Sequence, residues 1–207
     1  GRTWIYSLVG SILLMVSFVA VKWTGQVAWV TASLLTVALS AFPALTGHAN
    51  GTEELRWISL PSDIVHVSAV GAWIGGLTFV LLAEQAWRSR AGYPGDTLLP
   101  DLVPLFSRVA LPSVIVLLMT GILAAWMHLS SLSALLTTSY GRILIMKLVL
   151  VLVVLIIGFV NWRRITPRLM DLNGPPAMRK SAALELLFAH TVLLVTAVLT
   201  RTSLMDQ

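Results

Sequence analysis

The chain has no cysteine among its 207 residues. It therefore has no disulfide, no thiolate metal site and no covalently attached c-type haem. Motifs of common enzymes are also missing: there is no H-E-x-x-H zinc-protease motif, no G-x-S-x-G elbow and no phosphate-binding glycine loop. We expect that the protein is not an enzyme, and that any metal it binds is held without thiolates.

Charge is equally scarce, because 11% of the residues are charged and 57% are hydrophobic. The apolar residues form blocks near the length that crosses a hydrocarbon core of about 30 Å. Unbroken runs such as "ILIMKLVLVLVVLIIGF" favour helices, and the strand alternation of an outer-membrane barrel is missing. We predict an all-α, polytopic membrane helix bundle that forms a single domain over residues 1–207. Its six transmembrane helices are expected at residues 3–21, 26–46, 62–86, 104–127, 142–162 and 180–200.

Basic residues are distributed unevenly between the two sides of this bundle. One side carries only Arg2, Arg56, Arg142 and Arg201. By the positive-inside rule the richer side is cytoplasmic, so both termini are expected to be extracytoplasmic. The formal net charge of +5 then reflects topology and attraction to anionic lipid, and no nucleic-acid partner is expected. The richer side consists of the first, third and fifth loops, with Lys22, Arg88, Arg90, Arg163, Arg164, Arg168, Arg179 and Lys180.

Three of the four histidines fall in one leaflet of the predicted bundle. His48 follows the second helix, His66 lies one turn into the third, and His128 closes the fourth, all toward the outer side. His190 lies near the middle of the sixth helix, toward the outer half. Buried imidazoles are rare in lipid and usually functional, which favours a shared site. The alternative is a set of interfacial histidines bonded to water or to backbone carbonyls.

Methionines and an acid accompany these histidines. Met119 and Met127 lie in the outer half of the fourth helix, and thioether with imidazole suits Cu(I). The alternative for each methionine is gap filling in the core. Asp63 precedes His66 by three residues and shares its helical face, where it either orients the imidazole ring or caps the helix start. Trp73 extends the same stripe inward.

Two further features of the helices concern packing and charge. Gly71 and Gly75 form a small-xxx-small pair to which Gly76 adds, and this pattern predicts close approach of a neighbouring helix. Arg108 and Glu185 both lie toward the inner side, so an ion pair between them is one interpretation. Snorkelling of Arg108 to the nearer interface is the interpretation that we favour. In the loop after the fifth helix, Pro175 and Pro176 are expected to interrupt any helix.

Three long segments and one short one resemble a known family. They are "DIVHVSAVGAWIGGLTFVLL", "FSRVALPSVIVLLMTGILAAWMHLSSLSALLTTSYGRILIMKLVLVLVVLIIGFVNWRRITPRL", "ALELLFAHTVLLVTAVLTRT" and the preceding "ALTGHAN", which together cover most of residues 42–202. In this order they resemble the copper resistance protein D family of bacterial inner-membrane proteins. Members of that family often carry additional N-terminal membrane helices; if those helices carry ligands, the resemblance implies that the site in this shorter chain is incomplete or built with a partner chain.

The resemblance implies copper handling at the cytoplasmic membrane, commonly with a periplasmic copper-binding partner, copper resistance protein C. By motif match, His48 and His66 are candidate copper ligands, and Trp73 belongs to the supporting motif. A second matched cluster of unassigned role comprises Tyr140, Arg142 and Lys147.

These observations lead to one leading function and two alternatives. In the first, copper is accepted at the outer face by His48, His66 and His128, then passed inward by methionines and His190. In the second, two imidazoles from different helices ligate one b-type haem for electron transfer. In the third, the chain is an accessory structural subunit of a larger membrane complex. The lipid bilayer is a partner in all three, and homo-oligomerisation is compatible with each.

Overall fold

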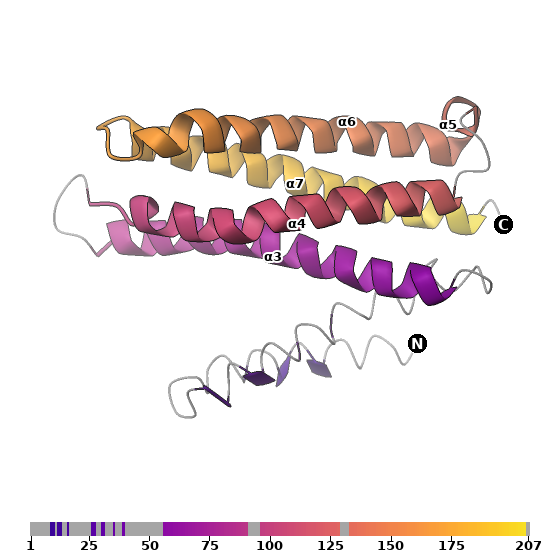
Figure 1. The fold of residues 1–207 in the computed structure, drawn as a ribbon, viewed down its shortest axis with the longest axis horizontal. Helices are drawn as coiled ribbons and strands as arrows, with labels where there is room; N and C mark the ends of the chain where they lie inside the picture. The colour runs from indigo at the N-terminus through magenta and orange to yellow at the C-terminus, as the bar shows by residue number, and fades with distance from the viewer. Residues whose placement is uncertain are drawn as a thin grey trace. The chain divides into compact units, whose positions relative to one another are not determined.

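The computed structural model describes residues 56–90, 96–128 and 133–205, together with scattered positions between residues 9 and 39. Every regular element in the three long ranges is a helix (Figure 1). The long helices are α3 (Arg56–Arg88), α4 (Leu99–His128), α6 (Ser139–Val160) and α7 (Gly174–Met205). Shorter elements are α5 (Ala134–Thr137), the π-helix η3 (Asn161–Ile165) and the 3-10 helix η4 (Thr166–Arg168).

Four of the described helices are long and apolar enough to cross a membrane. These segments are Trp57–Arg88, Leu99–Met127, Ser139–Arg168 and Gly174–Leu199. Large apolar side chains such as Phe79, Leu152 and Leu194 are more than half exposed, as expected of a lipid-facing surface. The all-α, multi-pass architecture is confirmed for this part of the chain. The first two predicted helices, at residues 3–21 and 26–46, fall largely outside the described residues, so the count of six and the location of the termini stay predictions.

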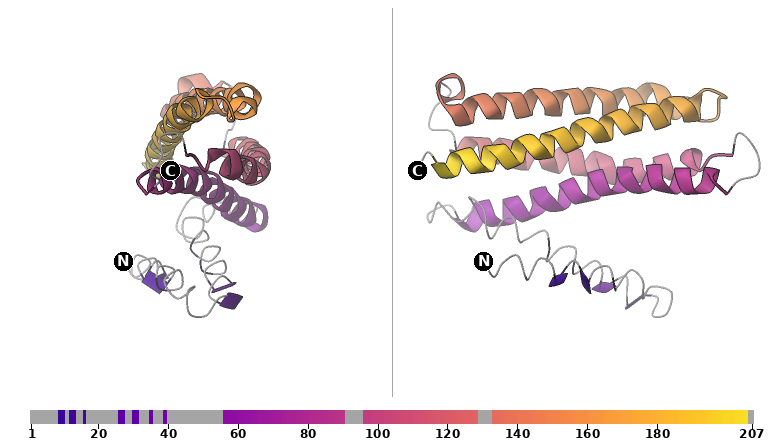
Figure 2. Two further views of the ribbon diagram at one scale, coloured as in Figure 1. Left: turned by 90° about the vertical axis from the view of Figure 1, so that its left-hand side faces the viewer. Right: turned by 180° about the vertical axis from the view of Figure 1, so that it is seen from behind.

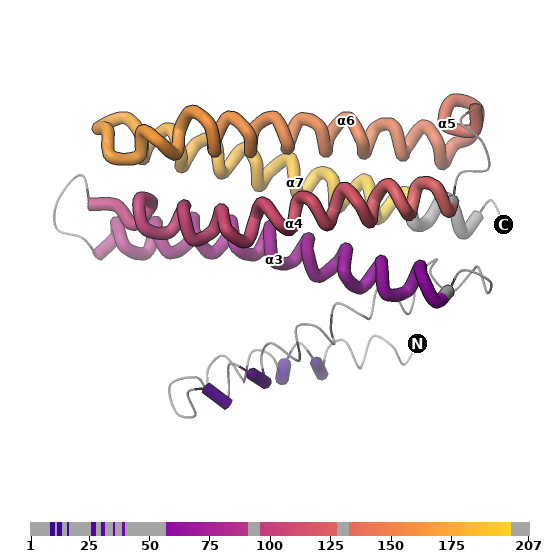
Figure 3. The backbone as a smooth tube through the Cα atoms, viewed as in Figure 1, coloured from indigo at the N-terminus to yellow at the C-terminus, as the bar shows by residue number. Residues whose placement is uncertain are grey.

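The chain divides into two compact units, residues 1–69 and residues 70–207. Helix α3 begins in the first unit and continues into the second. Within the second unit α6 and α7 lie side by side along most of their length, as both views in Figure 2 show. The backbone trace in Figure 3 brings the end of α3, the start of α4 and the η3–η4 segment to one end of this unit. That end also carries Arg88, Arg163, Arg164 and Arg168, which agrees with the uneven charge distribution in the sequence.

A small apolar core lies at this basic end of the second unit. Val80 of α3, Val103 of α4 and Met178 of α7 are all less than 7% exposed and belong to one cluster. Leu99 and Leu169 complete the buried set, and Phe106 and Ile165 pack against it. Because its members come from α3, α4, α7 and the segment before α7, this cluster fixes how the four spans meet at their basic end.

The start of α4 is fixed by a side chain from another helix. Glu84 of α3 accepts hydrogen bonds from the backbone N–H of Leu98 at 2.8 Å and from the Thr97 hydroxyl at 2.9 Å. The carboxylate thereby satisfies part of the open N–H end of α4 and complements the positive end of its dipole. The same carboxylate pairs with Arg179 of α7 at 2.9 Å. Helix α4 consequently begins at Leu99, five residues before the predicted start.

The expectation for the two adjacent prolines was wrong. Helix α7 begins at Gly174, and Pro175 and Pro176 lie inside its first turn. Proline is tolerated there because the first N–H groups of a helix have no partner within the helix, and the proline ring already holds a helical φ. The prolines therefore start a helix rather than interrupt one.

The small-residue prediction holds at Gly76 and not at Gly71 or Gly75. A Cβ atom added at Gly71 or Gly75 would meet no described atom within 4 Å. A Cβ atom at Gly76 would lie 3.1 Å from two ring carbons of Phe106 on α4. Close approach between α3 and α4 thus depends on Gly76.

Candidate functional site

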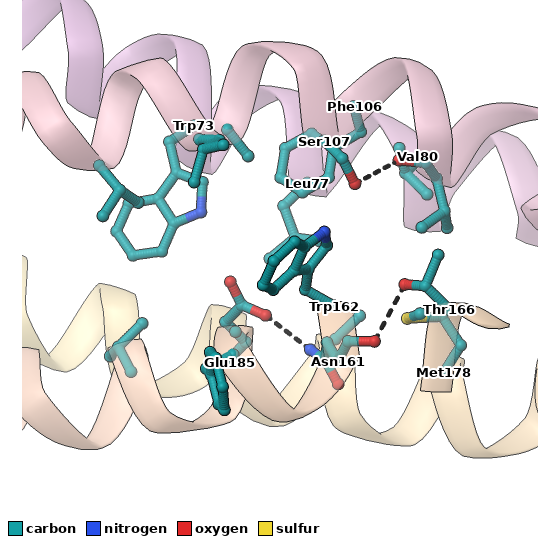
Figure 4. Close-up of a pocket in the computed structure, with 18 of the residues that line it drawn as sticks. Trp73, Leu77, Val80, Phe106, Ser107, Asn161, Trp162, Thr166, Met178 and Glu185 are labelled. Carbon is teal, nitrogen blue, oxygen red and sulfur yellow. Dashed lines mark hydrogen bonds between the residues drawn. The ribbon is translucent and has the colours of Figure 1, made fainter. Parts of the chain in front are cut away.

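A cavity of about 420 Å³ lies among the four long helices of the second unit (Figure 4). Its wall is mostly apolar, with aromatic rings from Phe106, Phe159 and Trp162. Pockets of this size that combine an apolar wall with a few polar groups are typical of ligand and ion sites. The polar side chains in the wall are Trp73, Ser107, Asn161, Trp162, Thr166 and Glu185.

Glu185 is the ionisable residue of this cavity wall. It lies near the middle of the candidate span Gly174–Leu199 and is only 5% exposed. The Asn161 amide donates a hydrogen bond from Nδ2 to its Oε2 at 2.7 Å. The Trp73 indole reaches toward the same carboxylate from α3. Among the described residues Glu185 forms no ion pair, so the carboxylate is held by neutral groups alone.

A local change of helix type positions Asn161. The α-helix α6 ends at Val160 and continues as the π-helix η3, whose first residue is Asn161. The Asn161 carbonyl accepts from the Thr166 backbone N–H and also from the Thr166 hydroxyl at 2.9 Å. A π-turn inserts an extra residue into the helix and is frequent at functional sites. Here it points the Asn161 side chain toward α7.

Gly158 of α6 lies beside the Glu185 carboxyl. A Cβ atom added to Gly158 would lie 3.4 Å from Oε1 of Glu185, which is ordinary van der Waals contact. The backbone of α6 therefore packs next to the carboxyl one turn before its amide partner. Asn161 itself is 7% exposed, and its Oδ1 atom has no hydrogen-bond donor among the described residues.

The candidate histidines belong to different units of the chain. His48 lies outside the described residues. His66 and Asp63 lie on α3 within the first unit, both half-buried and both engaged in interactions. His128 is the last residue of α4, and its side chain lies outside the described part. The predicted convergence of His48 and His66 therefore stays a prediction.

His190 lies on the exposed side of α7. Its Nδ1 donates to the Leu186 carbonyl of the preceding turn at 2.8 Å. In the neutral ring this bond leaves Nε2 as the acceptor, the atom able to bind a metal. His190 is not among the residues lining the cavity.

The remaining candidates lie on α4 and α6. Met119 is 66% exposed and Met127 half-buried on α4, whereas Tyr140, Arg142 and Lys147 belong to the first turns of α6. Tyr140 and Lys147 are half-buried and engaged in interactions, and Arg142 is exposed. No group of three His, Asp or Glu side chains with metal-binding spacing occurs within the described ranges.

Trp73 is the one predicted site residue that lines the cavity. Sequence reasoning missed Asn161 because it follows a long apolar run and precedes "WRR", a pattern typical of a helix end at the interface. Arg108 is exposed, in agreement with the favoured snorkelling interpretation, and its alternative pairing with Glu185 is not formed. The overlooked signal was the i, i+3 spacing of Gly158 and Asn161, which places a gap and an amide on one face of α6.

Comparison with known proteins returns one family and one curated relative. The model of the family described as "Copper resistance protein D" matches residues 100–199. The copper transport protein CutJ of Bacillus subtilis (strain 168) is 29% identical over 167 residues, which is 78% of this chain and 30% of that protein. The chain thus spans less than a third of this relative's length. No solved structure matches the chain.

Proposed function

Because this chain is related to the copper resistance protein D family, we propose that it is a copper-handling protein of the bacterial cytoplasmic membrane, with a transport or resistance role and no catalytic activity. Two observations support this together: the family match over residues 100–199 and the four candidate membrane spans. The relative from Bacillus subtilis, copper transport protein CutJ, is named for the same cargo.

In this proposal copper is the cargo, and it binds first at the extracytoplasmic face. His48 and His66 are the proposed first ligands, with His128 beside them, and Asp63 orients the His66 ring. Met119, Met127 and His190 then offer thioether and imidazole donors toward the interior, a set that suits copper better than magnesium or calcium. A periplasmic copper-binding protein of the copper resistance protein C type is the proposed donor.

Metal analysis and an optical spectrum of the purified chain test this function. We expect stoichiometric copper and no Soret band in the wild type. His66→Ala and His66→Gln are both expected to lower bound copper, because the amide of glutamine replaces hydrogen bonds but is a poor copper ligand. Val65→Ala, at an exposed position on the same turn, serves as the control and is expected to retain copper.

Three outcomes contradict the proposal. A Soret band with no bound copper indicates the b-type haem alternative. Retention of copper by both His66 variants removes this residue from the site. A protein that binds neither copper nor haem, with or without its proposed donor, is the accessory subunit of the third alternative.

A further inference from the structure

The second unit buries two glutamates, and their surroundings differ sharply. Glu84 is 1% exposed and receives Arg179, the Leu98 N–H and the Thr97 hydroxyl, all within 2.9 Å. Its negative charge is therefore matched by a guanidinium and by a helix terminus. Glu185 is nearly as buried, yet its donors are neutral groups, namely the Asn161 amide and the Trp73 indole.

Among the residues that the structure describes, no cation faces Glu185 from the helices packed against it. The cavity around it is lined by Trp73 and Leu77 of α3, Ser107 of α4, Gly158 of α6 and Asn161 of η3, and none of these side chains carries a charge. On α7 itself, Arg179 is committed to Glu84 at 2.9 Å and His190 bonds to its own helix. An ionised carboxylate in this apolar setting lacks the partner that buried charges normally require.

The hydrogen bonds of Asn161 indicate how the negative charge of Glu185 is neutralised. Its Nδ2 donates to the carboxylate, while Oδ1 is buried and has no donor among the described residues. Such an orphaned acceptor is rare and calls for an explanation. A carboxylic acid provides one, since its O–H can donate to the amide oxygen while its carbonyl accepts from the amide N–H.

We propose that the Glu185–Asn161 pair is an intramembrane proton-binding site that exchanges its proton through the adjoining cavity. On release, the O–H bond of the Glu185 carboxyl breaks, its electron pair stays on the carboxylate, and the proton passes to a water molecule that has entered the cavity. On binding, the reverse transfer restores the acid. The Asn161 amide stabilises both forms, because it has donors for the carboxylate and an acceptor for the acid.

Two structural features suit this pair for exchange. The π-turn at Asn161 directs its amide to the carboxyl, and both groups line the cavity. The cavity of about 420 Å³ is large enough to admit water to the carboxyl. This inference concerns a proton and does not depend on copper, so it stands or falls separately from the proposed function.

Infrared spectroscopy of the full chain in copper-free bilayers tests the site. We expect a protonated carboxyl C=O band at neutral pH, where exposed carboxyls are ionised, and we expect it to shift when the sample is moved into D₂O. Glu185→Gln should remove this band, whereas Asp171→Asn, a change of an exposed acid, should leave it unchanged.

Asn161→Ala keeps the carboxyl and removes its partner, so it provides a second readout if Glu185→Gln fails to fold. The band should then persist at a shifted frequency. The proposal is overturned if the wild type shows no such band at neutral pH, or if the band never shifts in D₂O. It is also overturned if Glu185→Gln leaves the band in place, or if Asn161→Ala leaves its frequency unchanged.

Discussion

Glu84 of α3 and Arg179 of α7 form an ion pair, and the Glu84 carboxylate also bonds to the start of α4. The pair is 2.9 Å long, and the carboxylate also caps α4. Removing one member of a buried pair costs more than the pair contributes, because the other charge is left buried without a partner. An uncharged replacement of both members avoids that penalty.

We predict that Glu84→Ala lowers the free energy of unfolding by about 3 kcal/mol, near the low end for broken buried pairs because Arg179 is 26% exposed. Thermal unfolding in detergent measures this, with Asp171→Ala at an exposed position as the control. The double variant Glu84→Gln/Arg179→Met should recover part of the loss. Equal stability of Glu84→Ala and wild type would show that the pair contributes nothing.

Residue depth was predictable from the sequence, whereas residue partners were not. The apolar blocks placed Glu185 inside a span and left Arg108 free to snorkel; Glu185 lies within a candidate span and Arg108 is exposed, in agreement with both predictions. The partner of Glu185 was missed because the π-turn that directs Asn161 toward α7 has no signature in the apolar pattern. The histidine cluster depends on His48, which lies outside the described residues, so it stays a prediction.

At the scale of helices, the predicted spans were right in number over residues 56–205 and too short at their starts. Helix α6 begins at Ser139, three residues early, because the Thr138 hydroxyl accepts a hydrogen bond from the Gly141 N–H at 2.9 Å. Helices α4 and α7 gain their first turns from Glu84 and from two prolines. Hydropathy detects the segment inside the hydrocarbon core, and it does not detect the caps that extend a helix beyond it.

The α3–α4 contact at Gly76 gives a prediction at this scale. Gly76→Val is expected to lower the free energy of unfolding by about 1–3 kcal/mol, because the new side chain meets the Phe106 ring. Gly71→Ala, which meets no described atom, should be neutral or stabilising by up to about 1 kcal/mol through helix propensity. Thermal unfolding of both variants checks the pair. A larger loss of stability in Gly71→Ala than in Gly76→Val would show that Gly71, and not Gly76, is the packing position.

For the whole molecule, the distribution of basic residues predicts which end of the second unit faces the cytoplasm. The end that carries Arg88 and Arg163 is expected to be cytoplasmic, and Ser133 before α5 is expected to face outward. Since the chain has no cysteine, single cysteine variants report position without background.

We predict that, in intact spheroplasts, an impermeant maleimide labels Ser133→Cys and leaves Ser89→Cys unlabelled until the membrane is permeabilised. Both serines are exposed, so access to reagent depends on the side of the membrane. Labelling of Ser89→Cys alone would invert the topology, and it would place the proposed copper entry on the cytoplasmic side.

Copper content of cells is the most direct measurement of the central proposal, that this chain handles copper through His48 and His66. Cells that express the chain, with its membrane insertion verified, should differ in copper content from cells with an empty vector. The double variant His48→Ala/His66→Ala, present at the same level, should return to the vector value. Identical copper content in the wild-type and vector cells, or in the wild-type and double-variant cells, would contradict the account.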